Sequence, residues 1–449
     1  MKTIVNKRIT SYHEACRYLD DMQMHKIKLG LEAMQMILAD IGSPERTCPA
    51  VHVAGTNGKG SVCTMLRSIL TEAGYKTGLY TSPHLSSVRE RFRIDETYIP
   101  ENDFARLMEM IRSALNGRSI TYFECATALA FSWFAEQECD LIIVETGMGG
   151  RLDATNVLKP LMSIITTISL DHEQYLGNTV EDVAFEKAGI IKEKTRVISG
   201  VRSDGPRAVI EKACIDRQAP LCTRDDDFFL RADEKHGWSW QDADGVSITN
   251  LALPIGGGWQ VENSATAIQA AVLLRDAGFH VPDEAIRSGL QTAHWPGRME
   301  LLEVSRTGSD ASDAENVSQS LRFLLDGAHN EAGVSFLVRA LDRSFRYERL
   351  LVVWGSMGDK KFDGMLNAVA RKADYLILTS PDSERSATPD ALAAALEGGG
   401  TRRFECIERV GDALQRINEM ATPEDLIVVA GSLYLIGEFR RLLVGEVVS

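Results

Sequence analysis

The sequence predicts a two-domain α/β protein. Short apolar segments that can form buried strands alternate with longer amphipathic segments that can form helices along most of the 449 residues. An early apolar segment ends in a glycine-rich turn of the kind that binds phosphate groups. A Pro-Gly pair at residues 296–297 separates two regions with this alternating pattern. We therefore expect a phosphate-loop ATPase domain with a central, mostly parallel sheet, followed by a smaller Rossmann-like α/β domain.

Length, composition and charge narrow the class of protein. Apolar residues make up 44% of the chain and charged residues 25%, which is typical of soluble globular proteins. The net charge of −14 argues against general binding to nucleic acid or to an anionic membrane surface. The first residues lack the apolar core of a signal peptide, and no apolar run is long enough to span a membrane. The eight cysteines are scattered without a C-x-x-C pair, so we expect reduced core residues in a cytoplasmic protein.

Residues 55–61, Gly-Thr-Asn-Gly-Lys-Gly-Ser, form the glycine-rich turn. A strand at 51–54 precedes it, and apolar residues with the spacing of one helix face follow it as far as Gly74, which can end the helix. The first turn of a helix presents free N–H groups and a favourable dipole to a phosphate. Lys59 adds a positive charge, and Ser61 adds a hydroxyl that can reach a magnesium ion.

This turn departs from the general phosphate-loop pattern at two positions. Val53 stands where the strict pattern has glycine, and Gly60 stands where it has serine or threonine. We still expect the turn to bind the phosphates of a nucleotide, because the strand, the helix, Lys59 and Ser61 are all in place.

Polar side chains follow three other predicted strands. Ser82 comes after the second strand, Glu145 closes the third, and His172 follows the fourth. The carboxyl ends of parallel strands meet at one edge of a sheet, so these side chains should lie near the phosphate loop. An acidic residue at the place of Glu145 lies beside magnesium in phosphate-loop proteins. From the residues alone, a glutamate after a buried strand is more often just the polar end of that strand, and a lone histidine is more often structural than a ligand.

The alternating pattern assigns elements to both domains. In the first domain, residues 1–296, we expect strands at 51–54, 76–80, 141–145, 161–168 and 196–200. We expect helices at 10–19, 29–37, 62–73, 123–136, 180–191, 206–217 and 283–292, and one that begins after Gly258. Residues 223–255, with an Asp-Gly pair, indicate a β-hairpin insertion. In the second domain, residues 297–449, we expect a polar loop at 305–319 and strands near 321–326, 349–354, 374–379 and 425–430.

Eight sequence blocks, taken together, resemble a known family. They are GTNGKGS at 55–61, TSPHL at 81–85, ETGMGGRLDATN at 145–156, DH at 171–172, FEKAGIIK at 185–192, PGRME at 296–300, DGAHN at 326–330 and GSLYLIGE at 431–438. In this order they resemble the folylpolyglutamate synthases and dihydrofolate synthases, which are relatives of the Mur peptidoglycan ligases. The resemblance covers nearly the whole chain, and the variant phosphate loop is the form that this family uses.

The resemblance implies an ATP-dependent carboxylate–amine ligase. A folate-type carboxylate would attack the γ-phosphate of ATP to give an acyl phosphate and ADP, and the amine of L-glutamate would then displace phosphate. The acceptor would be dihydropteroate, a reduced folate, or both. The implied cofactors are ATP and Mg²⁺, with two metal ions expected and room for a monovalent cation such as K⁺. The partners would be small molecules, with no nucleic acid and no membrane, and we expect a cytoplasmic monomer.

The resemblance also implies roles for single residues, each carried over by its motif. The residues that would hold ATP are Asn57, Gly58, Lys59, Gly60, Ser61, Asn263, Arg298 and Asp326. The residues that would ligate magnesium are Ser82, Glu145, His172 and a carbamylated Lys187. Asp153 would contact the pterin, and His329 and Ser432 would lie near the incoming glutamate. The residues with catalytic roles would be Lys59, Lys187, His172 and Arg298. Without the resemblance Lys187 would be an ordinary helical lysine.

Two alternatives stay open at this point. A nucleotide-dependent switch would also need the phosphate loop, although the chain has no N-K-x-D motif for reading guanine. A Mur-type ligase that acts on a cell-wall precursor would keep the chemistry and change the substrate. We expect no nucleotide-sugar domain of the Mur type, because the phosphate loop already begins at residue 55. The sequence also leaves open whether one or both folate reactions occur.

Overall fold

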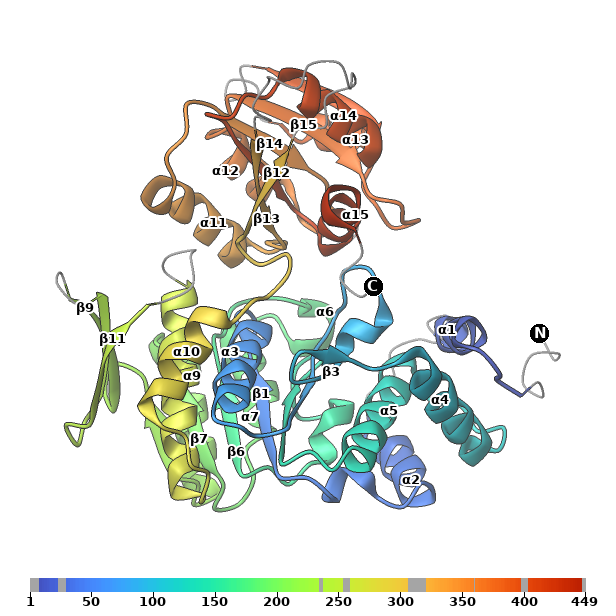
Figure 1. The fold of residues 1–449 in the computed structure, drawn as a ribbon, viewed down its shortest axis with the longest axis vertical. Helices are drawn as coiled ribbons and strands as arrows, with labels where there is room; N and C mark the ends of the chain where they lie inside the picture. The colour runs from blue at the N-terminus through green and yellow to red at the C-terminus, as the bar shows by residue number, and fades with distance from the viewer. Residues whose placement is uncertain are drawn as a thin grey trace. The chain divides into compact units, whose positions relative to one another are not determined.

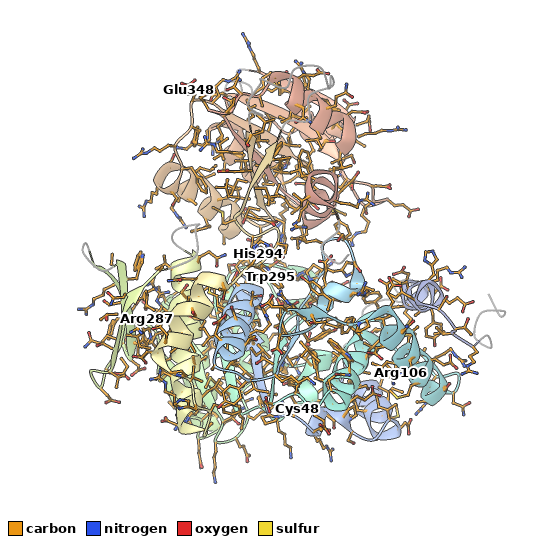
Figure 2. All side chains as sticks on the ribbon, viewed as in Figure 1. Cys48, Arg106, Arg287, His294, Trp295 and Glu348 are labelled. Atoms are coloured by element: carbon orange, nitrogen blue, oxygen red, sulfur yellow. The ribbon has the colours of Figure 1, made fainter. Side chains whose placement is uncertain are left out.

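The computed structural model of the chain describes residues 8–22, 30–233, 237–252, 259–305, 320–358, 360–396 and 403–445. The chain divides into two compact units between His294 and Trp295, which are labelled in Figure 2. The short segment Leu85–Ser87 groups with the second unit. The boundary expected from the sequence, at 296/297, lies just beyond this division. Of the polar loop expected at 305–319, all but Ser305 lies outside the described residues.

An eight-stranded sheet forms the centre of the first unit (Figure 1). Its strands are β1 (Ala50–Ala54), β2 (Thr77–Tyr80), β3 (Phe92–Ile94), β4 (Thr97–Tyr98), β5 (Leu141–Glu145), β6 (Met162–Ile165), β7 (Arg196–Ser199) and β8 (Leu221–Thr223). They lie in the order β4-β3-β2-β5-β1-β6-β7-β8; the pairs β2–β3 and β3–β4 are antiparallel and the other pairs are parallel. The structure confirms the predicted central, mostly parallel sheet and adds the two antiparallel strands at one edge.

Helices connect these strands. They are α1 (Tyr12–Asp21), α2 (Glu32–Asp40), α3 (Lys59–Glu72), α4 (Glu101–Leu115), α5 (Tyr122–Glu136), α6 (Glu173–Leu176), α7 (Val180–Ala188), α8 (Asp204–Asp216), α9 (Trp259–Asp276) and α10 (Asp283–Thr292). The cap predicted at Ser11 is present, because its side chain accepts a hydrogen bond from the N–H of Glu14. Gly74 does not itself cap α3: Ala73 is the cap, and Gly74 follows it with φ +89°, in the left-handed region that glycine favours.

Strand β1 lies at the middle of this sheet, between β5 and β6. Every residue of β1 and β5 is buried, as expected for parallel strands that are covered on both faces. The chain moves from β1 to β2 on one side and later to β6 on the other, so the strand order reverses at β1. Ligands of open α/β sheets bind outside the carboxyl ends of the strands at such a point. The phosphate loop, Ser82 and Glu145 all lie at this edge.

The insertion at 223–255 differs from its prediction. It contains a three-stranded antiparallel sheet, β9 (Phe228–Asp233), β10 (Gly237–Asp242) and β11 (Ser247–Leu251), where a two-stranded hairpin was expected. The Asp244-Gly245 turn joins β10 to β11. Arg287, labelled in Figure 2, donates from α10 to the carbonyl of Thr249 at 2.9 Å and ties this small sheet to the unit. A third strand follows physically, because a lone hairpin has too little core to be stable.

A six-stranded sheet forms the centre of the second unit. Its strands are β12 (Glu300–Ser305), β13 (Ser320–Asp326), β14 (Leu350–Trp354), β15 (Tyr375–Ser380), β16 (Phe404–Arg409) and β17 (Leu426–Ala430). They lie in the order β12-β13-β17-β14-β15-β16, and only β12 is antiparallel. Four of these strands were predicted, whereas the two edge strands, β12 and β16, were not.

Helices cover both faces of this second sheet. One face packs against α11 (Glu331–Ser344), α12 (Asp363–Ala370) and α13 (Pro389–Ala394), and the other packs against α14 (Val410–Met420) and α15 (Leu433–Val444). Alternate residues of one strand serve the two cores, so that Val428 faces the first set of helices and Val429 the second. This three-layer arrangement confirms the predicted Rossmann-like α/β domain.

Two smaller predictions need correction. Strand β6 ends at Ile165, not at 168, because the residues that follow turn toward the phosphate loop. All eight cysteines are free, as expected, but Cys406 is exposed and does not belong to a core. Within the described ranges, no helix is long and apolar enough to cross a membrane.

Candidate active site

The phosphate loop has the expected form of a strand, a tight turn and a helix. Helix α3 begins at Lys59, and Gly58 precedes it with φ +86°, a left-handed conformation that only glycine adopts without strain. A Cβ atom at Gly58 would lie 2.4 Å from Oδ1 of Asn263. The structure thus places Asn263, from α9, directly against the turn. Replacing Gly58 would strain the turn and crowd Asn263 at the same time.

A set of hydrogen bonds that holds this loop was not predicted from the sequence. The N–H of Thr56 donates to the carbonyl of Thr167 at 2.7 Å, and the N–H of Asn57 donates to the hydroxyl of Thr167 at 3.1 Å. The hydroxyls of Thr166 and Thr167 donate to the carbonyl of Asn57 at 2.7 and 3.0 Å. These bonds fix the turn against the segment after β6. Two adjacent threonines at the end of a parallel strand were the signal that could have indicated them.

Two lysines meet at one carbonyl oxygen beneath the loop. Nζ of Lys59 donates to the carbonyl of Gly55 at 3.0 Å, and Nζ of Lys187 donates to the same oxygen at 2.9 Å. The side chain of Lys187 is only 4% exposed. Burial, and then the charge of Lys59, lower the pKa of Lys187 to about 7. Near neutral pH a large fraction of Lys187 is therefore an uncharged amine, which is rare for lysine.

Glu145 lies beside the phosphate loop, close to Lys59. Its carboxylate is buried, it accepts the N–H of Ser82 at 3.2 Å, and its Oε1 lies 3.8 Å from Nζ of Lys59. A buried carboxylate beside a serine provides oxygen donors of the type that Mg²⁺ prefers. The structure therefore brings together Lys59, Ser82, Glu145 and Lys187 around the phosphate loop, and the oxygens of Ser82 and Glu145 could hold a metal ion there.

His172 lies on the loop after β6 and is less enclosed than these residues. It is the N-cap residue of α6 with φ +52°, and its side chain is 43% exposed. Its Nε2 lies 3.9 Å from Oδ1 of Asp171. In the described part of the chain, no three His, Cys, Asp or Glu side chains group into a metal site. The predicted set has only two residues of these types, so it depends on Ser82 and on a modified Lys187.

Asp153 occupies a buried position in the glycine-rich loop after β5. Its Oδ2 accepts the N–H of Met148 at 2.9 Å, and its Oδ1 accepts the N–H of Thr155 at 3.0 Å. The hydroxyl of Thr155 donates to the same Oδ1 and also lies 2.8 Å from Nε2 of His52 in β1. Burial raises the pKa of Asp153, and these donors oppose the rise. His52 and Thr155 were not predicted, although a histidine within a wholly apolar strand was a visible signal.

In the second unit, Arg298 and Asp326 lie at the end of β13. The carboxylate of Asp326 accepts the N–H groups of Met299 at 2.9 Å and of Ala328 at 3.0 Å. Arg298 donates to the carbonyl of Gly327 at 3.3 Å, and its charge counteracts the rise that burial causes in the pKa of Asp326. The sequence blocks around residues 298 and 326 thus form one structural unit.

His329 belongs to the same turn. Its Nδ1 lies 2.8 Å from the carbonyl oxygen of Gly327. A carbonyl can only accept, so the ring donates to it through Nδ1–H. The N–H of Gly431 donates to the carbonyl of Ala328 at 3.1 Å, which brings the segment with Ser432 beside this turn. Ser432 itself caps α15, since its hydroxyl accepts the N–H of Tyr434 at 3.2 Å.

A buried ion pair supports the turn that carries Arg298. Nε of Arg440, from α15, lies 3.1 and 3.0 Å from the two carboxylate oxygens of Glu300. Glu300 also accepts the N–H of Gly297 at 2.8 Å. The pair therefore fixes the chain on both sides of Arg298. Neither residue was predicted as part of the site.

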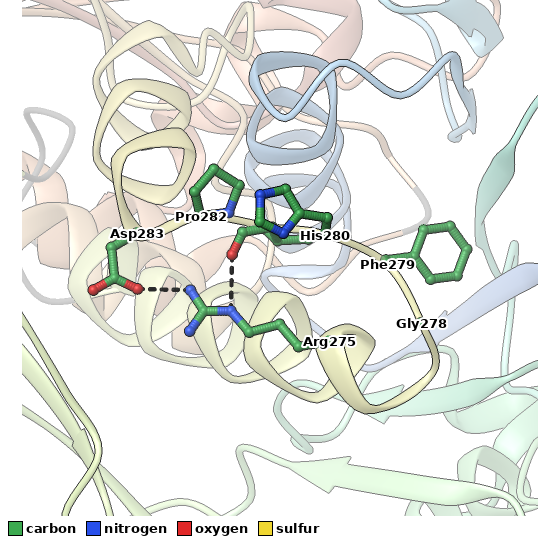
Figure 3. Close-up of a pocket in the computed structure, with 7 residues that line it drawn as sticks. Arg275, Gly278, Phe279, His280, Pro282 and Asp283 are labelled. Atoms are coloured by element: carbon green, nitrogen blue, oxygen red, sulfur yellow. Dashed lines mark hydrogen bonds and ion pairs between the residues drawn. The ribbon is translucent and has the colours of Figure 1, made fainter.

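One surface hollow lies apart from these residues. It has a volume of about 430 Å³ and is lined by the loop between α9 and α10 (Figure 3). Arg275 donates to the carbonyl of Val281 at 2.8 Å and to Asp283 at 2.7 Å, as the dashed lines show. Because its two charged side chains bind each other, this hollow offers no free charge to a ligand, and we do not assign it a role.

Comparison with known proteins finds matches for both units. Residues 53–271 match the Mur ligase middle domain, and residues 313–433 match the Mur ligase glutamate ligase domain. The dihydrofolate synthase/folylpolyglutamate synthase of Bacillus subtilis is 33% identical over 448 residues, which cover 97% of this chain and 99% of that protein. Two relatives are longer: the chain spans 50% of the probable bifunctional folylpolyglutamate synthase/dihydropteroate synthase of Haloferax volcanii and 51% of that of Halobacterium salinarum.

Solved structures show the same fold. The Escherichia coli FolC structure in complex with DHPP and ADP has a TM-score of 0.84 and 32% identity, and the match covers 96% of this chain and 97% of that one. The bifunctional folylpolyglutamate synthase/dihydrofolate synthase of Yersinia pestis, complexed with AMPPNP and a Mn ion, has a TM-score of 0.83 and 28% identity, with 97% and 98% covered. With two Mur ligase domains in order and a relative at 33% identity matched over 99% of its length, the chain belongs to the folylpolyglutamate synthase/dihydrofolate synthase family of Mur ligases.

Proposed function

We propose that the protein is an ATP-dependent ligase that joins L-glutamate to dihydropteroate, to reduced folates, or to both, through an acyl phosphate. The observation that carries this proposal is the convergence of Lys59, Lys187 and Glu145 on the phosphate loop, in a chain whose family performs this ligation. The cation of Lys59, the amine of Lys187 and a buried carboxylate beside one helix N-terminus suit the transfer of a phosphoryl group between anions.

Residues of the first unit would bind ATP and activate the acceptor. The turn from Asn57 to Ser61 would hold the phosphates, and Asn263 would lie beside them. Lys59 would leave the carbonyl oxygens that it contacts now and neutralise charge on the transferred phosphoryl group. Ser82, Glu145 and His172 would hold Mg²⁺, which when bound neutralises phosphate charge and orients the γ-phosphate. A second Mg²⁺ and a monovalent cation such as K⁺ are part of the proposal.

Lys187 would act as a carbamate. The uncharged amine of a lysine adds to carbon dioxide, whereas the ammonium form does not, so a pKa of about 7 favours the modification at neutral pH. The product is a carboxylate in place of an ammonium group. That change would relieve the repulsion between Lys187 and Lys59 and would add a negative group beside Glu145. The two lysines would then differ in role, with only Lys59 remaining a cation.

Residues of the second unit would complete the reaction. Arg298 and Asp326 would reach ATP, and His329 and Ser432 would lie near the incoming glutamate. Residues 1–296 would form the ATP-binding domain and residues 297–449 the glutamate-ligase domain. We also infer a monomer, and a cytoplasmic location that the free cysteines support.

The decisive assay supplies ATP, Mg²⁺ and L-glutamate with dihydropteroate or with tetrahydrofolate, side by side. We expect a conjugate that is heavier by one glutamate residue, together with one ADP for each conjugate, measured by mass spectrometry and a coupled ADP assay. ADP release should require the acceptor. A folded protein that forms no conjugate with either acceptor would contradict the proposal. ATP hydrolysis that needs no acceptor would favour a nucleotide switch, and preference for a peptidoglycan intermediate would favour a cell-wall ligase.

A further inference from the structure

A buried polar chain runs from the central strand of the first unit to the loop that carries Asp153. His52, in the middle of β1, is fully buried, and its Nε2 lies 2.8 Å from the hydroxyl of Thr155. That hydroxyl donates in turn to Oδ1 of Asp153. All the other residues of β1 are apolar. A histidine at this place needs a reason, because burying an imidazole in an apolar strand is unfavourable unless it forms a hydrogen bond.

The hydrogen bonds of this polar chain all point one way, from His52 through Thr155 to Asp153. The single proton of the Thr155 hydroxyl goes to Asp153, so the ring of His52 donates through Nε2–H. Its Nδ1 has no hydrogen-bond partner among the described residues and is left as a lone pair. The reverse direction would need a protonated Asp153 and a buried Nδ1–H without an acceptor. Orphaned buried N–H groups are rarer and more costly than orphaned acceptors, so the structure favours the first direction.

The charge of the ring is also fixed. Burial, and then the charge of Lys192, lower the pKa of His52 to about 3, so the ring is neutral at physiological pH. Nζ of Lys192 is occupied by the two oxygens of Asn156, at 2.9 and 2.8 Å. The neutral ring therefore has one donor, and the geometry commits it to Thr155.

The orientation of the Asp153 carboxylate follows from this direction. Its Oδ1 receives both the N–H and the hydroxyl of Thr155, which use the two lone pairs of that oxygen. Its Oδ2 receives the N–H of Met148 at 2.9 Å. Rotation of the carboxylate would break the bonds to Thr155. Of the two oxygens, Oδ2 is thus the one left with accepting capacity for an added ligand.

We propose that His52 and Thr155 are positioning residues that hold Asp153 as an oriented carboxylate, with Oδ2 presented to an N–H donor of the acceptor substrate. This inference rests on the proposed function, which assigns Asp153 to that substrate. The ligand chemistry is a heteroaromatic ring with N–H groups, because a carboxylate that can only accept selects donors. The competing explanation is that the chain merely fastens the loop to β1. It predicts equal damage to all substrates, whereas positioning affects only the acceptor.

The first test compares Thr155→Val with Thr155→Ser. Valine removes the hydroxyl at nearly constant volume, and serine keeps it. We expect Thr155→Val to raise the KM for the acceptor about tenfold or more, which is the usual loss for one hydrogen bond to a charged group. The KM values for ATP and L-glutamate should stay within about twofold, the scatter expected for unrelated sites. Thr155→Ser should restore the acceptor KM. An unchanged acceptor KM in Thr155→Val, or an equal rise for all three substrates, would overturn the proposal.

The second test is made on the wild-type protein and needs no active enzyme. The wild-type protein is labelled with ¹⁵N-histidine, and the His52 signals are assigned by their loss in His52→Gln. We expect a neutral ring protonated at Nε2 and unprotonated at Nδ1 near neutral pH. A ring protonated at Nδ1 would overturn the inference, even if the protein forms the conjugate. Conversely, a protein that makes no conjugate with any acceptor refutes the proposed function. The tautomer of His52 then still shows the direction of the hydrogen bonds between His52, Thr155 and Asp153.

Discussion

Replacing Lys187 by methionine should reduce turnover by about a hundredfold or more, the loss typical for one preorganised electrostatic group, while ATP binding stays nearly unchanged. The reason is that methionine fills the buried space but cannot form a carbamate. The wild-type enzyme should lose activity in buffer freed of carbon dioxide and regain it when bicarbonate is added, and the variant should respond to neither. Steady-state kinetics and nucleotide titration measure the two effects separately.

Lys212→Met is the matched control for this change. Lys212 lies on α8, its side chain is 76% exposed, and it pairs only with Asp216 at 2.8 Å among its recorded contacts. The same loss of a lysine charge there should leave turnover and the bicarbonate response as in the wild type. Full activity in Lys187→Met, or a wild-type rate that is indifferent to bicarbonate, would refute the carbamate role.

Replacing Lys187 by methionine should also stabilise the protein when Lys187 is not carbamylated. The folded-state pKa of Lys187, about 7, lies below its value of 10.5 in an unfolded chain, so the folded state binds fewer protons between these values. Wild-type stability therefore rises with pH through this window. Below it, the full cost of burying a charged Lys187 lowers the unfolding free energy. The gain in unfolding free energy from Lys187→Met should be on the order of a few kcal/mol near pH 7 and should shrink toward pH 10.5. Denaturant unfolding of both proteins, with a metal chelator present and carbon dioxide excluded, measures this difference in free energy. A gain independent of pH would contradict the lowered pKa of Lys187.

Replacing Lys59 by methionine should damage nucleotide binding and chemistry together. Lys59 starts the helix that follows the phosphate loop, with Nζ held by the carbonyl oxygens of Gly55 and Thr56 at 3.0 and 3.3 Å. It can move from these neutral acceptors to a phosphate. We expect a loss of about a hundredfold to a thousandfold in kcat, as for other charge-stabilising donors, and a higher dissociation constant for ATP.

Lys59→Arg should not rescue this variant, because the larger planar guanidinium cannot replace a compact ammonium group in a tight turn. The contrast with Lys187 is the sharper test. The affinity for ATP should fall in Lys59→Met and should remain at the wild-type value in Lys187→Met. If both variants weaken ATP to the same extent, the division of roles between the two lysines is wrong.

Much of the fold could be predicted because local patterns determine it. The buried strands are short apolar runs, and several helix starts carry capping residues, such as the reciprocal pairs Thr121–Glu124 and Thr179–Asp182. The edge strands β12 and β16 could not be predicted in the same way. An edge strand gains its stability from its neighbour more than from its own residues, and β16 has no buried residue at all. The third strand of the small sheet was missed for the same reason.

The phosphate loop could be located from sequence, but the contacts that hold it could not. Asn57 and Thr167 are 110 residues apart, and no local pattern links them. The same holds for His52 and Thr155, which are 103 residues apart. Lys187 is instructive in a different way. Its unusual pKa arises from burial and from the neighbouring charge of Lys59, and both are properties of the folded chain.

The most direct test of the central claim follows one oxygen atom. The acceptor is prepared with ¹⁸O in the carboxylate that is to be conjugated, and it is incubated with ATP, Mg²⁺, L-glutamate and the wild-type enzyme. If that carboxylate attacks the γ-phosphate, each turnover transfers one ¹⁸O to inorganic phosphate and leaves the other in the new amide. Mass spectrometry should therefore find one ¹⁸O in the phosphate released with each conjugate. Phosphate without ¹⁸O, or label in AMP, would show that no acyl phosphate forms and would contradict this account.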